Sequence, residues 1–481
     1  MAISPKGWEA GDAEHSTEVS NLSGDGKPRR AFLAAWMSHP CLYLFMLAFT
    51  LRTAVAISLT NVFSGSLVLD DQTYWGEIAA DIARGTTETW SPYIEGLYER
   101  TRAFSLPLGV VYKLFDGNQL SGQLLVATAG AGLSVVVFLI ARELFGKTSL
   151  ALVPGLLVAL LPSQVLWSSL VLKDSFVWFG LACLTYAFIR LARVHELKRI
   201  VLLIVLLGLS LFLLAFLRAH TTVVAAWSLL LASCFVPRLH RALKIIGVAS
   251  VSVLIPWIAG LGLLGVPFAL SASPVTTLRD ANAVGAQSAI ITPPAETMRR
   301  LTLRQTELEK ELLEAETGPA TEQRAERADE LRAELSHVEA LIAAEQGTGV
   351  VNRPGAPAPT DPSRRIGVRY VARGVSVMLL EPYPWDPSTS PSFTMAKLEG
   401  IVWYPVVFLV VIGSVRAFRH WRLMLLPVLL GFGTMLLYAL TEGNVGTAFR
   451  HRGEFVWVIA LLAAFGVSEL VSRRAGWTSV S

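Results

Sequence analysis

The sequence predicts an all-α polytopic membrane protein, a bundle of about ten transmembrane helices with polar segments on the extracytoplasmic side. Composition is the first observation: 53% of the residues are hydrophobic and 16% are charged, and the mean hydropathy is +0.51, far above the range of soluble proteins. The second is length, because several apolar segments reach the roughly 20 residues that a helix needs to cross hydrocarbon. We therefore expect a multi-pass protein of the plasma (inner) membrane.

The apolar segments define the expected spans and the basic residues between them define the orientation. The spans are expected at about 40–64, 119–141, 148–171, 175–193, 199–217, 221–236, 243–269, 399–417, 423–440 and 455–471. Clusters of Arg and Lys stay on the cytoplasmic side of a membrane. With both termini cytoplasmic, the clusters that contain Arg142, Arg199, Arg241 and Arg422 all lie inside.

Charge and cysteine content exclude two other classes. The formal net charge of +4 does not indicate nucleic-acid binding, because the basic residues fall in short clusters between apolar segments. The three cysteines, Cys41, Cys183 and Cys234, lack the spacing of a metal or redox site. We expect them to be packing residues in apolar segments.

Polar stretches divide the chain into modules. In chain order we expect a disordered cytoplasmic tail over 1–38, an N-terminal transmembrane module over 39–270 with its first outer loop at 65–118, an extracytoplasmic segment over 271–398, a C-terminal transmembrane module over 399–472 and a cytoplasmic tail over 473–481.

The extracytoplasmic segment contains a predicted helical hairpin. Leucines at spacings of three, four and seven residues mark two helical arms within 296–346, broken at Gly318-Pro319. A Pro-rich linker follows at 347–363. The apolar stripes fit a hairpin that packs on itself and also one that binds a protein partner, so both interpretations stay open.

An acidic pair, Asp70 and Asp71, follows the first span, where the chain leaves the bilayer. Two adjacent carboxylates repel each other, which raises the pKa of at least one and gives a group able to accept a proton near neutral pH. A structural interpretation is that Asp70 caps an amphipathic helix that begins near Gln72, with Asp71 in its first turn. Both interpretations can hold at once, and either residue can be the base.

Two further polar features fall on the outer face. Lys173-Asp174 lies between two spans, and a lysine there can act as a point charge for phosphate. An internal ion pair or a side chain that reaches the interface would explain it equally well. Arg218 and His220 close a span on the same side, where an interfacial anchor is the structural alternative.

The turn before the last span is the most basic outer feature. It runs from Glu442 through Asn444 to Arg450, His451 and Arg452, with glycines that permit close backbone approach. Such a turn gathers cationic donors as a phosphate requires. Basic residues that set the orientation of a membrane protein lie on the cytoplasmic side, whereas these three are expected on the outer side, which favours a binding site.

These residues resemble a known family. The acidic pair followed by Tyr74, Ala79 and Gly85 resembles the Asp-acidic-x-x-Tyr signature of polytopic GT-C glycosyltransferases, in the style of the protein O-mannosyltransferases and the lipid A aminoarabinose transferases. The run from Phe104 to Lys173-Asp174 is similar to that group as well. The resemblance covers the first half of the chain. The hairpin is not a general feature of the family, and no second acidic motif of the family can be placed.

The resemblance implies a GT-C-like bundle and a glycosyltransferase that moves a sugar from a polyprenyl-phosphate donor to an extracytoplasmic glycan, lipid or protein, with inversion. Asp70 and Asp71 then stand where such enzymes keep the catalytic base. The residues expected at the donor phosphate are Lys173, Arg218, His220, Arg450, His451 and Arg452, and the supporting residues are Tyr74, Asp174 and Asn444. No cofactor is certain, although paired aspartates such as Asp70 and Asp71 can hold a divalent cation as readily as a proton.

Three alternatives remain. A polymerase or ligase of surface polysaccharide would use a lipid-diphosphate donor at the same face. A transporter or flippase of lipid-linked glycans would carry charge within several spans, whereas these spans look nearly free of charge. An assembly protein that works through the hairpin 296–346 would leave Asp70 and Asp71 without a purpose.

Overall fold

A computed structural model of the chain describes residues 38–62, 70–90, 92–235, 241–265, 294–317, scattered positions from 324 to 339, 368–385, 391–441 and 445–478. The side chains of Asp70 and Asp71 lie outside this described part, as do Asn444 and the whole linker predicted at 347–363. Contacts divide the chain into two units, Met1–Tyr43 and Leu44–Ser481. All secondary structure in the described residues is helical.

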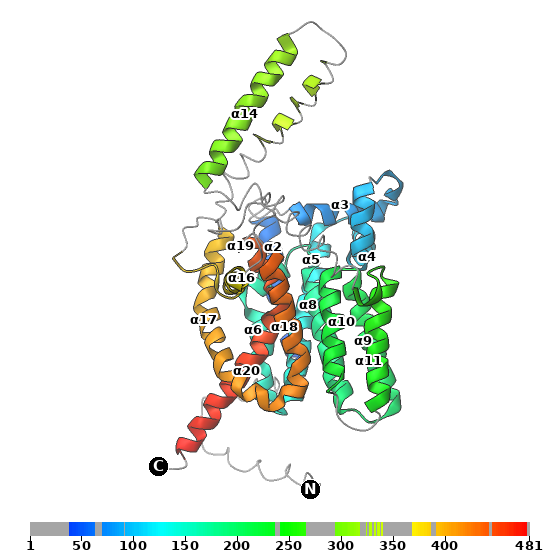
Figure 1. Cartoon of the computed structure of the whole chain (residues 1–481), viewed down its shortest axis with the longest axis vertical. Helices are drawn as coiled ribbons and strands as arrows, with labels where there is room; N and C mark the ends of the chain where they lie inside the picture. The colour runs from blue at the N-terminus through cyan, green and yellow to red at the C-terminus, as the bar shows by residue number, and fades with distance from the viewer. Residues whose placement is uncertain are drawn as a thin grey trace. The chain divides into compact units, whose positions relative to one another are not determined.

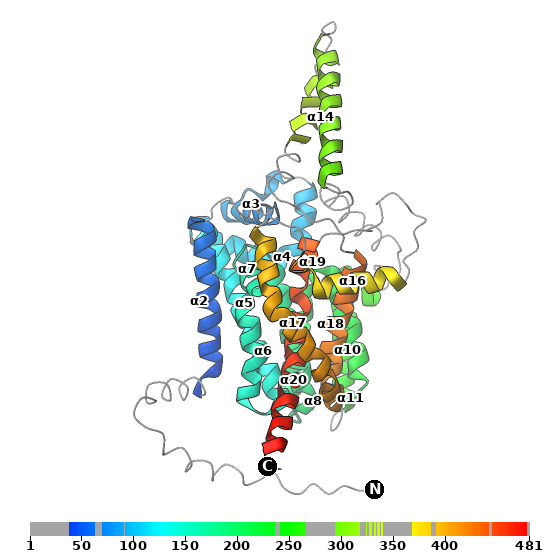
Figure 2. The same cartoon turned by 90° about the vertical axis from the view of Figure 1, so that its left-hand side faces the viewer.

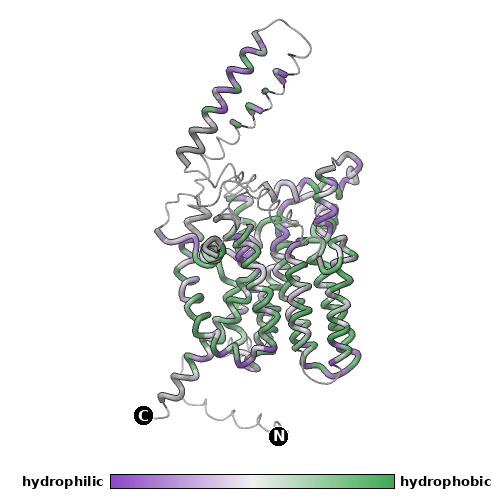
Figure 3. Tube along the Cα trace, viewed as in Figure 1, coloured by the Kyte–Doolittle hydropathy of each residue, from purple (hydrophilic) through white to green (hydrophobic). Residues whose placement is uncertain are grey.

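The long helices, some of them broken, carry most of the chain. In order they are α2 (Pro40–Asn61), α5 (Gln119–Phe145), α6 (Thr148–Leu160), α8 (Asp174–Arg193), α9 (Leu197–Ala215), α10 (Ala219–Ser233), α11 (Arg241–Ile258), α17 (Pro391–Ala417), α18 (Trp421–Thr441) and α20 (Gly453–Thr478). Hydrophobic residues cover these helices and hydrophilic residues gather at their ends (Figure 3).

The coarse prediction of a helical membrane protein is confirmed. Seven stretches of the described residues are long and apolar enough to cross a membrane, one of which, Ala396–Leu440, includes most of α17 and of α18. Two shorter apolar helices, Thr148–Leu160 and Ala219–Ser233, fall below that length. The count of ten spans and the side on which each loop lies stay predictions.

The segment expected as one span at 148–171 does not form a single continuous helix. Helix α6 ends at Leu160, and a short helix α7 (Pro162–Trp167) follows. Pro162 has no N–H to continue α6, and Leu161 before it adopts the extended backbone that precedes proline. Positions 163–172, which comprise most of α7 and the non-helical residues after it, are nevertheless buried. Non-helical backbone within a membrane requires burial of this kind.

A buried arginine holds this break together. Arg52 of α2 donates to the carbonyl oxygens of Ala159 (3.1 Å) and Val158 (3.2 Å), which the end of α6 leaves without helical partners. Its Nε donates to Ser168 Oγ at 2.6 Å. A Cβ at Gly130 of α5 would lie 2.7 Å from that Nε, so only glycine fits there. The expectation that the spans are nearly free of charge is therefore wrong for α2.

The first outer loop, expected at 65–118, contains two helices, α3 (Asp70–Arg84) and α4 (Pro92–Leu114), with the 3-10 turn η1 (Thr87–Thr89) between them. Helix α3 is amphipathic, and its buried face carries Trp75, Ile78 and Ala79. It lies across the direction of the long helices (Figures 1 and 2). Its first two residues are the acidic pair, so the predicted start near Gln72 is two residues late.

Asp81 closes the turn after α3. Its carboxylate accepts hydrogen bonds from Trp90 Nε1 (2.9 Å), Arg84 (2.6 Å) and Thr86 Oγ1 (3.3 Å). Burial alone would raise the pKa of Asp81, but these hydrogen bonds outweigh it and lower the pKa below its usual value. The stabilisation is therefore complete above the usual pKa of aspartate and is lost as the pH falls through the lowered one.

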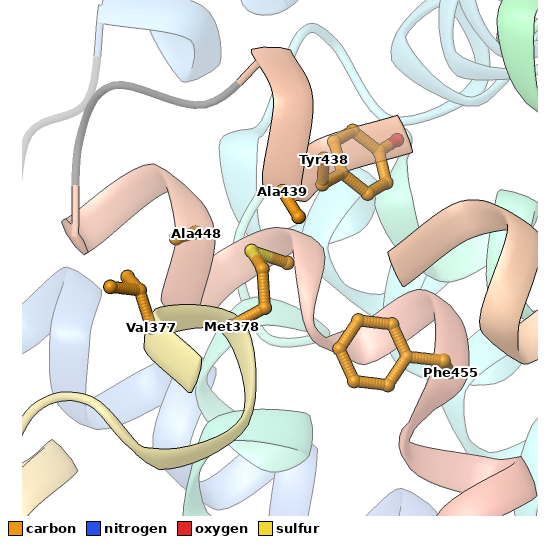
Figure 4. Packing of buried hydrophobic residues seen from close by; sticks show 6 residues of the cluster. All are labelled: Val377, Met378, Tyr438, Ala439, Ala448 and Phe455. Atoms are coloured by element: carbon orange, nitrogen blue, oxygen red, sulfur yellow. The ribbon is translucent and has the colours of Figure 1, made fainter. Parts of the chain in front are cut away.

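Helix α16 (Val368–Leu380) packs across the ends of α18 and of α19 (Val445–His451), as Figure 2 shows. Six buried residues form the contact: Val377, Met378, Tyr438, Ala439, Ala448 and Phe455 (Figure 4). Helix α17 fixes the end of α16, because Trp403 Nε1 donates to the carbonyl oxygen of Leu379 at 2.6 Å. This packing orients Tyr438, which enters the site described below.

Helix α14 (Pro294–Thr317) packs against the second arm of the predicted hairpin. Leu308, Leu331 and Val338 are buried between the arms, and Arg304 pairs with Glu334 at 2.9 Å. The short η2 (Leu263–Gly265) and η3 (Phe418–His420) complete the helical elements of the described residues.

Helices α17 and α20 meet backbone to backbone at two glycines. A Cβ at Gly413 would collide with the carbonyl oxygen of Leu462, and one at Gly466 would collide with that of Leu409. Small residues allow this approach, which is the main source of packing between helices in lipid.

We expect Gly413→Ala to destabilise the protein by about 1–3 kcal/mol, because the carbonyl of Leu462 cannot move away from the new Cβ without bending α20. Gly208→Ala is the matched control, since a Cβ there meets only Val251 at an ordinary 3.7 Å. Thermal unfolding of the purified protein in detergent measures both. Equal midpoints for the two variants would contradict the packing described here.

Candidate functional site

Five side chains, four of them buried and one partly buried, join the ends of α8, α10, α18, α19 and α20 in one charge network. Its members are Asp174, Arg218, Tyr438, Arg450 and Glu454. Asp174 and Glu454 are fully buried, and the side chain of Arg218 is 6% exposed. Charges shielded from water in this way are costly, which marks the network as a functional candidate.

Arg218 is the centre of the charge network. Its guanidinium donates to Asp174 Oδ1 at 2.6 Å, to Glu454 Oε1 at 2.5 Å and to the Tyr438 hydroxyl at 2.7 Å. Arg218 stands directly before α10, in extended backbone that lets its side chain turn inward. One cation therefore holds the first residue of α8 and the second residue of α20 together.

The remaining oxygens of Glu454 are also satisfied. Tyr438 donates its hydroxyl proton to Glu454 Oε1 at 2.6 Å, and Thr221 donates to Oε2 at 3.0 Å. His220 Nε2 lies 3.2 Å from the same hydroxyl. The His451 ring stacks on Tyr438 with 4.4 Å between ring centroids. Both predicted histidines therefore touch the charge network through Tyr438.

Asp174 bridges the two arginines of the charge network. Its Oδ2 accepts from Arg450 Nε at 2.7 Å and from a terminal guanidinium nitrogen at 2.6 Å, while Oδ1 faces Arg218. The two carboxylates balance the two guanidinium groups in formal charge. His451 and Lys173 lie close enough to interact electrostatically, with Asp174 and with His220 respectively, and add positive potential.

Lys173 connects the charge network to α3. It stands directly before α8, and its Nζ lies 5.1 Å from the ring centroid of Trp75 in α3. Phe104 of α4 packs on the same Trp75 ring, edge to face, at 6.1 Å. Because Asp71 precedes Trp75 by four residues, one turn of helix separates the acidic pair from this contact.

Arg452 belongs to a second cluster, together with Glu399 and Ser163. Its guanidinium lies 3.6 Å from Glu399 Oε1 and packs over the Phe449 ring at 4.5 Å. Ser163, at the start of α7, donates its hydroxyl to the same carboxylate at 2.9 Å. Burial lowers the pKa of Arg452 to about 10 although Glu399 opposes the shift, so the group stays charged at pH 7.

Hydrogen-bonding capacity remains around the second cluster. Both amide atoms of Gln164 are buried and have no hydrogen-bond partner in the described part of the chain, and the same holds for Trp167 Nε1 and Arg452 Nε. Gln164 and Trp167 lie on α7, and the Trp167 ring packs against Phe449 at 6.4 Å. A polar ligand can use such groups without displacing a protein contact.

The structure thus gathers six of the residues predicted from sequence: Lys173, Asp174, Arg218, His220, Arg450 and His451. It separates Arg452 from them. Arg218 is engaged by two carboxylates and a hydroxyl, which suits a structural tie better than the donor-phosphate contact expected of it. Tyr74 is 44% exposed on α3. Asn444 and the side chains of Asp70 and Asp71 lie outside the described residues.

Sequence reasoning missed Glu454, Tyr438 and Glu399. A signal for the two acids existed, because each is a lone carboxylate within or beside an apolar stretch, and such a charge is functional or paired by default. Tyr438 had no signal, since a tyrosine near the end of a span ordinarily lies at the interface. Among the described residues no group of three His, Cys, Asp or Glu side chains could hold a metal ion. A cation at Asp70 and Asp71 stays a prediction.

Comparison of the chain with protein-family models gave no match, and comparison with curated proteins gave no significant match either. The GT-C resemblance therefore rests on the sequence residues quoted for it.

We expect Arg218→Met to destabilise the protein by about 3–5 kcal/mol, because it leaves Asp174 and Glu454 buried without their shared cation. Thermal unfolding in detergent measures the loss. Arg199→Met is the matched control, since Arg199 pairs with Glu196 at an exposed position (59% and 64%) and should change stability little.

Adding Glu454→Gln to Arg218→Met should restore part of the stability, because it removes the carboxylate that has lost its cation, whereas Asp174 keeps its ion pair with Arg450. A double variant less stable than Arg218→Met alone would contradict the assignment of Arg218 as the cation that compensates Glu454.

Proposed function

We propose that the protein is an integral membrane glycosyltransferase that transfers a sugar from a polyprenyl-phosphate donor to an extracytoplasmic acceptor, with inversion at the anomeric carbon. The observation that carries the proposal is the contact of Lys173 with Trp75. It brings the helix that begins with Asp70 and Asp71 to the basic end of the charge network. A base and a set of cations side by side are what this transfer requires.

In the proposed reaction one carboxylate of the acidic pair accepts the proton of the acceptor hydroxyl. The acceptor oxygen forms a bond to the anomeric carbon while the bond from that carbon to the phosphate oxygen breaks. The electron pair leaves with the polyprenyl phosphate, which gains one negative charge. Cations close to the phosphate stabilise that charge, and they matter more than a proton donor because phosphate is a good leaving group.

The charges of the site suggest different roles for its cations. Lys173 stands at the boundary between α3 and the charge network, which suits contact with the donor phosphate. Arg450 faces Asp174 with a side chain that is 12% exposed, at the edge of the same network. Arg218 already donates hydrogen bonds to two carboxylates and a hydroxyl, so its role would be to keep Asp174 and Glu454 in place. Preorganised charge of this kind stabilises a transition state without rearrangement.

The free polar groups beside the charge network support a polar substrate. The amide of Gln164 and the indole N–H of Trp167 are donors and acceptors of the kind that bind sugar hydroxyls, and they have no hydrogen-bond partner among the described residues. Helix α7, which carries both, packs against α19, which carries Arg450 and His451.

We expect Asp70→Asn or Asp71→Asn to lower the rate of sugar transfer by about a hundredfold or more, with donor affinity unchanged, because a base acts only in the transition state. The measurement is transfer of radiolabelled sugar from a polyprenyl phosphate in reconstituted membranes. Glu77→Gln is the matched control, since it removes an exposed carboxylate from the same helix.

Full transfer by the Asp70→Asn/Asp71→Asn double variant would end the assignment of this pair as catalytic. Transfer that occurs only from a lipid diphosphate would identify a polymerase or ligase. Movement of the lipid-linked sugar across the membrane without transfer would identify a flippase. A flippase is a competing hypothesis because charges such as Arg52 are buried within the helices.

Lys173→Ala should weaken binding of the donor lipid phosphate about ten- to a hundredfold and slow transfer as well, because a charge-assisted contact to phosphate exists in both the ground state and the transition state. Binding of the donor to the reconstituted protein measures the first effect. Lys113→Ala, at an exposed position of α4, should leave both unchanged. Unchanged donor affinity in Lys173→Ala would contradict the role given to this lysine.

A further inference from the structure

One face of α17 is apolar and exposed along most of the helix and into η3. Its side chains, which we call the α17 stripe, are Leu398, Ile401, Phe408, Val411, Val415 and Phe418, with exposed fractions of 61, 72, 66, 66, 78 and 75%. Spacings of three, four and seven residues put them on one side of a helix. Because α17 lies in a stretch that can cross a membrane, acyl chains are the natural cover of this face.

The α17 stripe ends at a groove between α17 and α20. The groove has a volume of about 310 Å³ and is lined by Ile412, Val415, Arg416, Arg419, Glu469 and Leu470. Val415 belongs to the stripe as well, and Leu470 is 46% exposed on the opposite wall. Apolar surface therefore continues from the stripe into a groove whose end is charged.

Two guanidinium groups and one carboxylate line this groove. Arg416 donates to Glu469 at 2.6 Å and to Ser472 Oγ at 3.0 Å, so part of its hydrogen-bonding capacity is used. Arg419 is exposed and forms no ion pair with any described residue. The groove lining thus carries one positive charge more than it carries negative charge.

Further positive charge lies close by. Arg193 of α8, Arg416 and Arg419 all interact electrostatically with His420 of η3. An anion in the groove would meet this potential from three elements, α8, α17 and η3. The phosphate that fits both the charge and the adjoining apolar stripe is the phosphodiester of a lipid whose headgroup carries no cation of its own.

We propose that the groove between α17 and α20 binds the headgroup of an anionic phospholipid, with Arg419 and Arg416 at the phosphate and the acyl chains along the α17 stripe. The site lies between the ends of α17 and α20 that carry Arg416 and Glu469, whereas the charge network lies at the start of α20. It is independent of the sugar-transfer proposal.

Native mass spectrometry of the full-length protein in detergent tests this proposal. The probes are dioleoyl phosphatidylglycerol and dioleoyl phosphatidylcholine, which share acyl chains and phosphate, while the second carries a compensating cation. We expect tighter binding of phosphatidylglycerol. Its affinity should fall several-fold in Arg419→Gln and about tenfold or more in Arg416→Gln/Arg419→Gln, at about 1 kcal/mol for each arginine. Phosphatidylcholine binding should not change.

Arg422→Gln is the matched control, because Arg422 lies in the same turn, packs over the Trp421 ring at 5.5 Å and does not line the groove. An equal loss of phosphatidylglycerol affinity in Arg422→Gln would mean that the basic residues attract anionic lipid only by their total charge. That result would overturn the proposal of a specific site. Equal affinity for the two lipids, or complete displacement of phosphatidylglycerol by inorganic phosphate, would overturn it as well. If the double variant does not fold, the exposed Arg419→Gln decides alone.

Discussion

The guanidinium of Arg218 is the contact on which the arrangement of this end of the bundle depends. It reaches a carboxylate from α8, a carboxylate from α20 and a hydroxyl from α18, all shielded from water. A single ion pair at this depth would barely compensate for the loss of hydration, whereas a cation shared between two carboxylates and a hydroxyl satisfies every group that it touches. Helices far apart in sequence therefore converge here, and Arg450, His451 and Lys173 take their positions around them.

The second cluster repeats this principle on a smaller scale. Glu399 of α17 accepts from the start of the short helix α7 and faces Arg452. The break that creates α7 is held on its other side by Arg52. Two arginines and one glutamate thus hold α7 and the non-helical residues on either side of it buried in protein, an environment in which a membrane tolerates non-helical backbone.

Hydropathy located nearly every long helix, because the tendency of an apolar segment to form a buried helix is a local property. The exception at 148–171 is also local in cause, since Pro162 ends α6, but an apolar sequence on both sides of the proline conceals the break. Six polar residues of the site could be recognised because each is expensive in its context. The ion pairs that these residues form could not be predicted, because Arg450 and Arg452 are only two positions apart and yet pair with different acids. That choice is made by the end of α19 between them, a feature that residue spacing does not contain.

Two long-range connections of the site have a consequence for the order in which the protein is made. Glu399, the partner of Ser163, and Glu454, a partner of Arg218, each lie 236 residues further along the chain and are synthesised later. While the ribosome is still completing the second half, the first half carries a buried arginine without its full set of acids and a short helix without its cap. The N-terminal module is therefore not a finished domain to which a second one is added. Its interior is completed from the other end of the chain, and a chain released early would present unpaired charge to the bilayer, the kind of defect by which membrane quality control can recognise an incomplete protein.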